Sequence, residues 1–169
     1  MGLYTPVAGQ TLTGSFLNNA FLNVTPQTVT KGGDTSRSST TTLTNDPDLA
    51  FTAIANINYY VFVGLYYDAG AGLIKFDLSL PAGASRNQLP GGLDTSVTAS
   101  GSGIVRLTRN AQNLGSAGAG TTVGAIYTAQ VTMSSTAGAV TFQWAQNSSS
   151  GTATIVKAGS WLVAIPQPQ

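Results

Sequence analysis

The chain of 169 residues contains no cysteine and no histidine, and all six of its acidic residues are aspartates. Without cysteine there is no disulfide framework and no thiolate metal site, and the redox compartment stays undecided. Without histidine, nucleophilic triads and most general-base schemes lack their base. Catalysis by two carboxylates would need paired aspartates in a cleft, whereas aspartates scattered over turns are more often turn formers. We therefore expect a non-enzymatic protein.

Charge of either sign is also scarce. Charged residues make up 8% of the chain and the formal net charge is +1, whereas ordinary soluble proteins have about 25% charged residues. At 42% hydrophobic residues the chain is unlike a disordered one, so it should fold. Weak charge repulsion is tolerable in an assembly, which favours a homo-oligomer, with a trimer as our hypothesis. The seven basic residues are scattered and form no patch for a phosphate backbone, so we expect no nucleic acid partner.

Long hydrophobic runs are missing as well. No apolar run reaches the roughly 18 residues of a membrane span, and the N-terminus lacks the basic-then-apolar pattern of a signal peptide. We expect no membrane association. We also expect the protein to be made in a cytoplasm, without a classical export signal.

The first thirty residues differ from the rest. Residues 13–15, Thr-Gly-Ser, can cap a short helix that carries an apolar stripe. Two helical turns are unstable alone in water, so this segment must dock, either on its own domain or in a neighbouring subunit. We therefore divide the chain into a helical or extended anchor, residues 1–30, and a β-domain, residues 31–169. The candidate anchor residues are Phe16, Leu17, Phe21 and Leu22.

The β-domain is organised around residues 59–80. Residues 59–68 are apolar or aromatic on both alternating faces, as in a strand covered on two sides, and residues 74–80 alternate cleanly. The four small residues 69–72 between them predict a hairpin connection. Further strands are expected at residues 38–44, 49–54, 97–99, 104–108, 123–133, 140–144, 152–156 and 161–165, with a turn at 45–48 and long loops at 85–93 and 110–120.

This series of about eight to ten short strands predicts an all-β fold, an antiparallel β-sandwich or jelly roll. In residues 123–133, Tyr127, Ala129, Val131 and Met133 should face inward. Burial of one large aromatic side chain contributes very roughly 2 to 3 kcal/mol, so aromatic residues should drive the core. The expected core aromatics are Phe51, Phe62, Phe76, Phe142, Trp144 and Trp161.

Two polar groups leave alternatives open. Asn45, Asp46 and Asp48 are either turn formers or oxygen ligands for Ca²⁺, although their spacing lacks the regular pattern of a calcium loop. Asp34 and Arg37 are close enough to pair across a turn, which contributes at most about 1 kcal/mol if the pair is exposed.

A dense group of tyrosines leaves a third alternative. The group either packs in the core and on a sheet face, or provides a stacking platform for sugar rings or an intersubunit contact. The candidate aromatic surface is Tyr66 and Tyr67, and the two other members are Tyr59 and Tyr60.

Two blocks of sequence are similar to a known family. The first block consists of DTSRSSTTTL at residues 34–43 and DPDL at 46–49, followed by the tyrosine-rich strand. The second block consists of FQWAQNSSS at 142–150, which leads to VKAGSWL at 156–162. Together they resemble a β-sandwich module of structural proteins in tailed bacteriophages, particularly those of actinobacteria. A weaker similarity links residues 9–18 to the starts of small phage virion proteins.

The resemblance implies a virion component, assembled in the host cytoplasm, with no cofactor and no catalytic residues. Its partners would be the major capsid protein or tail proteins. Our leading hypothesis is a capsid decoration protein on the outer surface of the head. The alternative is a minor tail or tail-fibre protein that binds a host-surface glycan.

Overall fold

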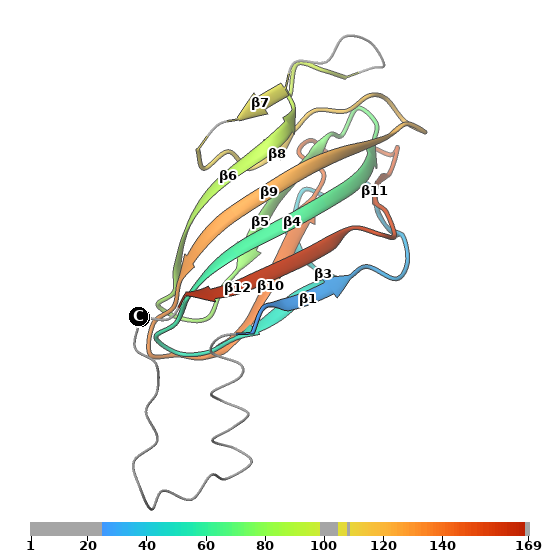
Figure 1. Ribbon diagram of the computed structural model, residues 1–169. Helices are drawn as coiled ribbons and strands as arrows, with labels where there is room; N and C mark the ends of the chain where they lie inside the picture. Colours follow the sequence, from blue (N-terminus) through green and yellow to red (C-terminus); the bar gives the residue numbers. More distant parts are fainter. Residues whose placement is uncertain (1–24, 99–104, 108, 168–169) are drawn as a thin grey trace, which may run out of the picture.

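The computed structural model describes residues 25–98, 105–107 and 109–167. Within these residues every regular element is a β-strand, and twelve strands form two antiparallel sheets packed as a sandwich (Figure 1). This confirms the expected all-β sandwich. Residues 1–24, which include the candidate anchor residues Phe16, Leu17, Phe21 and Leu22, lie outside the described part.

The larger sheet has eight strands. Its main order is β1-β12-β4-β9-β6-β7, and β11 pairs with both β4 and β2. The bounds are β1 Gln27–Thr30, β2 Thr35–Arg37, β4 Asn58–Ala69, β6 Ser85–Leu93, β7 Val105–Leu107, β9 Thr122–Thr132, β11 Thr154–Val156 and β12 Trp161–Gln167. The long strands β4 and β9 pair along eleven residues, from Asn58 opposite Thr132 to Asp68 opposite Thr122, and form the centre of this sheet.

The smaller sheet has four strands in the order β3-β10-β5-β8. Their bounds are β3 Thr44–Ala53, β5 Ile74–Ser79, β8 Asn113–Leu114 and β10 Gly138–Ala145. This sheet lies behind the larger one in Figure 1. Ile74, Phe76 and Leu78 of β5 point into the core, which is the face that the alternation predicts.

The core is an aromatic cluster enclosed by aliphatic residues of both inner faces. The ring centroids of Phe76 and Tyr127 are 5.6 Å apart, those of Tyr127 and Phe142 5.7 Å, and those of Phe76 and Phe142 6.0 Å. The two contacts of Tyr127 are edge-on and the contact between Phe76 and Phe142 is stacked, and all three add to the burial of the rings. Because Tyr127 comes from the larger sheet and the two phenylalanines from the smaller one, the cluster joins the layers.

The predicted hairpin of residues 59–80 is wrong in one respect. Both strands exist, but β4 pairs with β9, β11 and β12, whereas β5 pairs with β8 and β10, so the connection crosses from one sheet to the other. The Leu73 N–H donates to the Gly70 carbonyl, and Leu73 has a φ of 53°. Local alternation sets the strands and the tight turn, but the sheet that each strand joins depends on distant partners.

Residues 85–93, expected as a loop, form β6. Pro90 lies opposite Tyr127 of β9, and only Gly91–Leu93 pair with β7 on the other side. The missing N–H of Pro90 is tolerated because it falls where β6 has a single neighbour. The proline and glycines are typical of a loop, which is why the sequence did not predict this strand.

The region around Asp46 also differs from expectation. Residues 38–43 are not in a strand, and β3 begins at Thr44 and continues through the expected turn at 45–48. The turn chemistry is nevertheless present, because Asp46 Oδ1 accepts the N–H groups of Asp48 and Leu49 at 3.0 and 3.2 Å. The sheet absorbs this local turn as a register shift between Thr141 and Gln143 of β10.

Residues 97 and 98, part of another expected strand, lie outside any strand. The Val97 N–H donates instead to the Asp94 carbonyl, which closes a turn after β6.

Candidate interaction surface

The outer face of the larger sheet exposes large apolar side chains. Tyr60, Tyr66, Leu89 and Ile126 are 43%, 46%, 45% and 47% exposed, and they come from β4, β6 and β9. Neighbours along these strands point into the core because side chains alternate. With the partly buried Phe62 and Trp161, which point the same way, these four residues form what we call the outer apolar face.

The strand register brings these residues together. Phe62 lies opposite Thr128, which lies opposite Leu89; one row along, Gly64 lies between Trp161 and Ile126. A Cβ built on Gly64 would be 2.2 Å from Cε2 of the Trp161 indole. The indole therefore lies directly on the backbone of β4, in a space that only glycine leaves open.

Two shallow hollows mark this face. The larger, of about 540 Å³, is lined by Tyr60, Phe62, Leu89 and Gln130, with Arg109 as its one charged lining residue. The smaller, of about 330 Å³, lies among Tyr66, Ile126, Trp161 and four glycines of β4, β6 and β9. Aromatic walls over a backbone floor suit flat apolar or ring-shaped partners.

The outer face of the smaller sheet has different chemistry. Its outward positions include Thr52, Lys75, Asp77 and Gln143, and none of the large exposed hydrophobic residues lies there. Asp77 accepts hydrogen bonds from Arg86 and Gln112. The described part of the sandwich thus has one small polar face and one broad apolar face.

The two tyrosines proposed as an aromatic surface are separated by the strand alternation. Tyr66 is exposed, but Tyr67 is 0% exposed. The Tyr67 hydroxyl donates to the Gly115 carbonyl at 2.7 Å, and burial raises its pKa above the ordinary tyrosine value. Tyr67 is a core residue, so its proposed surface role is wrong.

The outer apolar face contains residues that the sequence placed elsewhere. Phe62 and Trp161 were expected in the core but are partly exposed on the outside, whereas Phe51, Phe76, Phe142 and Trp144 are buried as expected. Leu89 was not assigned to a face, because residues 85–93 were expected to form a loop. Ile126 had a signal that we missed, because it is apolar at an outward position, next to the inward Tyr127.

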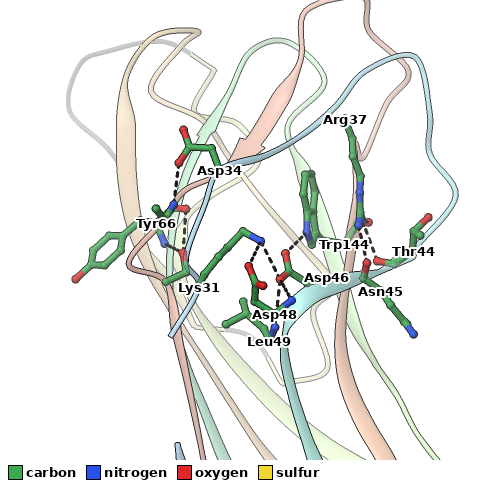
Figure 2. Close-up of polar contacts among 12 residues, drawn as sticks. Lys31, Asp34, Arg37, Thr44, Asn45, Asp46, Asp48, Leu49, Tyr66 and Trp144 are labelled. Atoms are coloured by element: carbon green, nitrogen blue, oxygen red, sulfur yellow. Dashed lines mark hydrogen bonds and ion pairs between the residues drawn. The ribbon is translucent and has the colours of Figure 1, made fainter. Parts of the chain in front are cut away.

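A buried polar cluster lies at the start of β3 (Figure 2). Lys31 Nζ is 3.0 Å from Asp46 Oδ1 and 3.1 Å from Asp48 Oδ2. The indole N–H of Trp144 donates to Asp46 Oδ2 at 3.0 Å. We call Lys31, Asp46, Asp48 and Trp144 the lysine cluster. An ammonium already lies between the two carboxylates proposed as calcium ligands, so the geometry favours the other alternative for Asp46, a turn former.

Asp34 and Arg37 were expected to be close enough to pair across a turn, but each bonds other partners. The Arg37 guanidinium lies 4.0 Å from the Trp144 ring centroid and donates to the Thr44 and Trp144 carbonyls, and desolvation lowers its pKa (Figure 2). Asp34 accepts the Ala158 N–H at 2.8 Å and bonds Lys157 Nζ at 3.1 Å. These hydrogen bonds, the backbone one first, hold the pKa of Asp34 below its usual value.

Within residues 25–98, 105–107 and 109–167, no group of three or more acidic, histidine or cysteine residues has a geometry that could hold a metal ion. The same residues include no helix long and apolar enough to cross a membrane.

Comparisons with known proteins assign no family. No family model matches the chain, and no curated protein matches it. Among solved structures it aligns with a chain of the structure of infectious bursal disease virus Gt strain at 13% identity and a TM-score of 0.20. The alignment covers 85% of this chain and 41% of that chain. A likeness at this level does not extend to function.

Proposed function

We propose that this protein is a non-enzymatic structural component of a tailed bacteriophage virion, a decoration protein on the outside of the head. The observation that carries the proposal is the outer apolar face. Four large apolar side chains, each more than two fifths exposed, lie together on one sheet. Contiguous exposed apolar surface is unusual in a monomer and marks contact sites. The resemblance of residues 34–49 and 142–162 to phage virion modules supplies the setting.

The mechanism is cohesion. Removing aromatic and aliphatic side chains from water at a seam between subunits stabilises the assembled shell, because only the assembled state buries them. A homo-oligomer, with a trimer as the specific hypothesis, would place several copies of the face around one symmetry axis. Residues 1–24 would add a second attachment, through Phe16, Leu17, Phe21 and Leu22.

A matched pair of variants tests the face. Ile126→Asp places a charge in the middle of the outer apolar face, and Ala139→Asp places the same charge at an exposed strand position of the smaller sheet. Both proteins are added to particles that lack this component, and bound protein is counted after sedimentation. We expect Ile126→Asp to lose most binding and Ala139→Asp to retain it. Equal binding by both would refute the role of the face.

A truncation tests the anchor. Deleting residues 1–24 leaves all the described strands intact, since β1, the first of them, begins at Gln27. We expect a folded domain, by circular dichroism, that no longer joins particles. Undiminished incorporation would refute the anchor role.

One observation favours the alternative, a tail protein that binds a host-surface glycan. The exposed Tyr66 and the indole of Trp161 line a hollow whose floor is glycine backbone, as a stacking site for a sugar ring requires. A glycan array and the copy number per particle separate the two proposals. Hundreds of copies without glycan binding support the head, and a few copies with glycan binding support the tail.

A further inference from the structure

The lysine cluster buries charge where burial is costly. The side chains of Lys31 and Asp46 are both 0% exposed. An ion pair taken out of water loses hydration that its mutual attraction barely replaces, and apolar residues of similar volume are often as stabilising. In a chain with 8% charged residues, a fully buried lysine therefore needs a reason other than stability.

The cluster has the arrangement of a condensation site. Nζ of Lys31 lies 3.0 Å from Asp46 Oδ1. The carboxyl carbon Cγ is bonded to that oxygen, so a small shift of Nζ along the carboxylate brings the two reacting atoms into contact. Asp46 is held in place by four donors: Lys31, the indole N–H of Trp144, and the backbone N–H groups of Asp48 and Leu49. Hydrogen bonds therefore hold both reactants in place.

We propose that Lys31 and Asp46 join through an intramolecular isopeptide bond. Transfer of one proton from the ammonium of Lys31 to the carboxylate of Asp46, both fully buried, removes both charges and leaves a neutral amine beside a carboxylic acid. The amine lone pair of Nζ attacks Cγ of Asp46 and forms the C–N bond. The C–O bond to one carboxyl oxygen then breaks and that oxygen leaves as water. Nζ, Cγ and the remaining oxygen form the amide. No oxidant, cofactor or other reactant is consumed.

Asp48 has the position of the proton carrier. Its Oδ2 lies 3.1 Å from Nζ, so it can accept the proton that the nitrogen loses and return it to the departing oxygen. Its side chain is 38% exposed, which gives the released water a route out of the cluster. The indole N–H and the two backbone N–H groups point at the oxygens on which negative charge develops during the attack.

The product would join Lys31, the residue directly after β1, to Asp46 near the beginning of β3. The bond would lie within one chain, so this inference is independent of the proposed virion role. A covalent tie across the sandwich resists mechanical and thermal opening of that end, because the strands cannot separate without breaking an amide.

Intact-mass spectrometry of the fully denatured wild-type chain tests the proposal. We expect a mass lower by one water molecule than the sequence requires, after allowing for the initiator methionine. A mass equal to that of the sequence would overturn the proposal and leave the cluster as an ion pair.

Peptide mapping gives the position. Trypsin cuts after lysine and arginine, and an acylated Lys31 is no longer cut. The cross-linked chain should therefore yield one branched species, residues 1–37 joined to residues 38–75, and no peptide ending at residue 31. Separate peptides 1–31 and 38–75 in full yield would contradict the bond even if the mass were unexpected.

Two variants identify the reacting groups. Lys31→Met and Asp46→Ala each remove one reactant, and both should have the full mass of their own sequences. Asp48→Asn keeps both reactants and the volume of the cluster but removes the proton carrier, so the cross-linked fraction should fall at least tenfold at early times after refolding. Loss of water in Lys31→Met would assign the mass change to another site and overturn the proposal.

Discussion

The contact between Gly64 and Trp161 offers the sharpest test of the structure. It predicts that the effect of Gly64→Ala on the free energy of unfolding changes sign when Trp161 is removed. Gly64 lies in the interior of β4 and has no positive φ, so alanine fits its backbone. A Cβ there would be 2.2, 2.3 and 2.5 Å from three atoms of the indole. Gly64→Ala must therefore displace Trp161 from the sheet, and overpacking of this kind costs about 1 to 3 kcal/mol.

Removing the indole first should reverse the effect. In a Trp161→Ala background the three atoms nearest to the new methyl group are removed. Alanine is then better than glycine in a strand by roughly 0.5 to 1 kcal/mol, because it loses less backbone entropy on folding. Gly64→Ala should thus destabilise the wild-type chain and stabilise the variant, with a coupling free energy of about 1.5 to 4 kcal/mol.

Urea unfolding of the four proteins, followed by far-ultraviolet circular dichroism, measures this cycle. Midpoints are compared at a common slope, because a changed slope would report a different unfolded or folded state. The same sign and size of effect in both backgrounds would refute the packing of Trp161 on Gly64, and with it the shape of the outer apolar face.

Two further predictions concern buried polar groups. Trp144→Phe keeps most of the ring volume but leaves Asp46 Oδ2 without its indole donor, so it should cost about 1 to 3 kcal/mol in urea unfolding, and a loss below about 0.5 kcal/mol would contradict the contact. Burial raises the pKa of Tyr67 and Tyr127 above the ordinary 10.0, so their contribution to stability is complete below pH 10 and is lost as the pH rises further. Ultraviolet titration should show these tyrosines ionising only as the protein unfolds, whereas early ionisation of all six would contradict their burial.

The sequence predicted the parts of the fold that depend on alternation. In β9 the inward residues Tyr127, Ala129 and Val131 are all buried, as is Met133 directly after the strand, because a period of two on a strand with one covered face leaves no other arrangement. The same logic could have separated Tyr66 from Tyr67. It did not separate Phe62 and Trp161 from the core, since an apolar residue on an outward face looks the same in sequence as one on an inward face.

Other features depend on contacts that no local pattern contains. The sheet that β5 joins is decided by its pairing with β10, about sixty residues later in the chain. The lysine cluster joins Lys31 to Asp46, fifteen residues away, and Asp46 to Trp144, ninety-eight residues away. A lone lysine between threonine and glycine has no local feature that predicts burial, so this cluster was visible only in the structure.

The scarcity of charge has different consequences in different parts of the molecule. Among the side chains that the structure describes, Lys31 is buried, Arg37 lies over the Trp144 ring, Arg86 pairs with Asp77, and Lys157 pairs with Asp34. Arg109 alone among the charged residues lines the larger hollow, and it donates to Asn87. The outer apolar face therefore has almost no charge with which to attract or orient a partner. Binding there must derive from apolar burial and shape, which makes close packing by side chains such as Ile126 and Trp161 the condition for specificity.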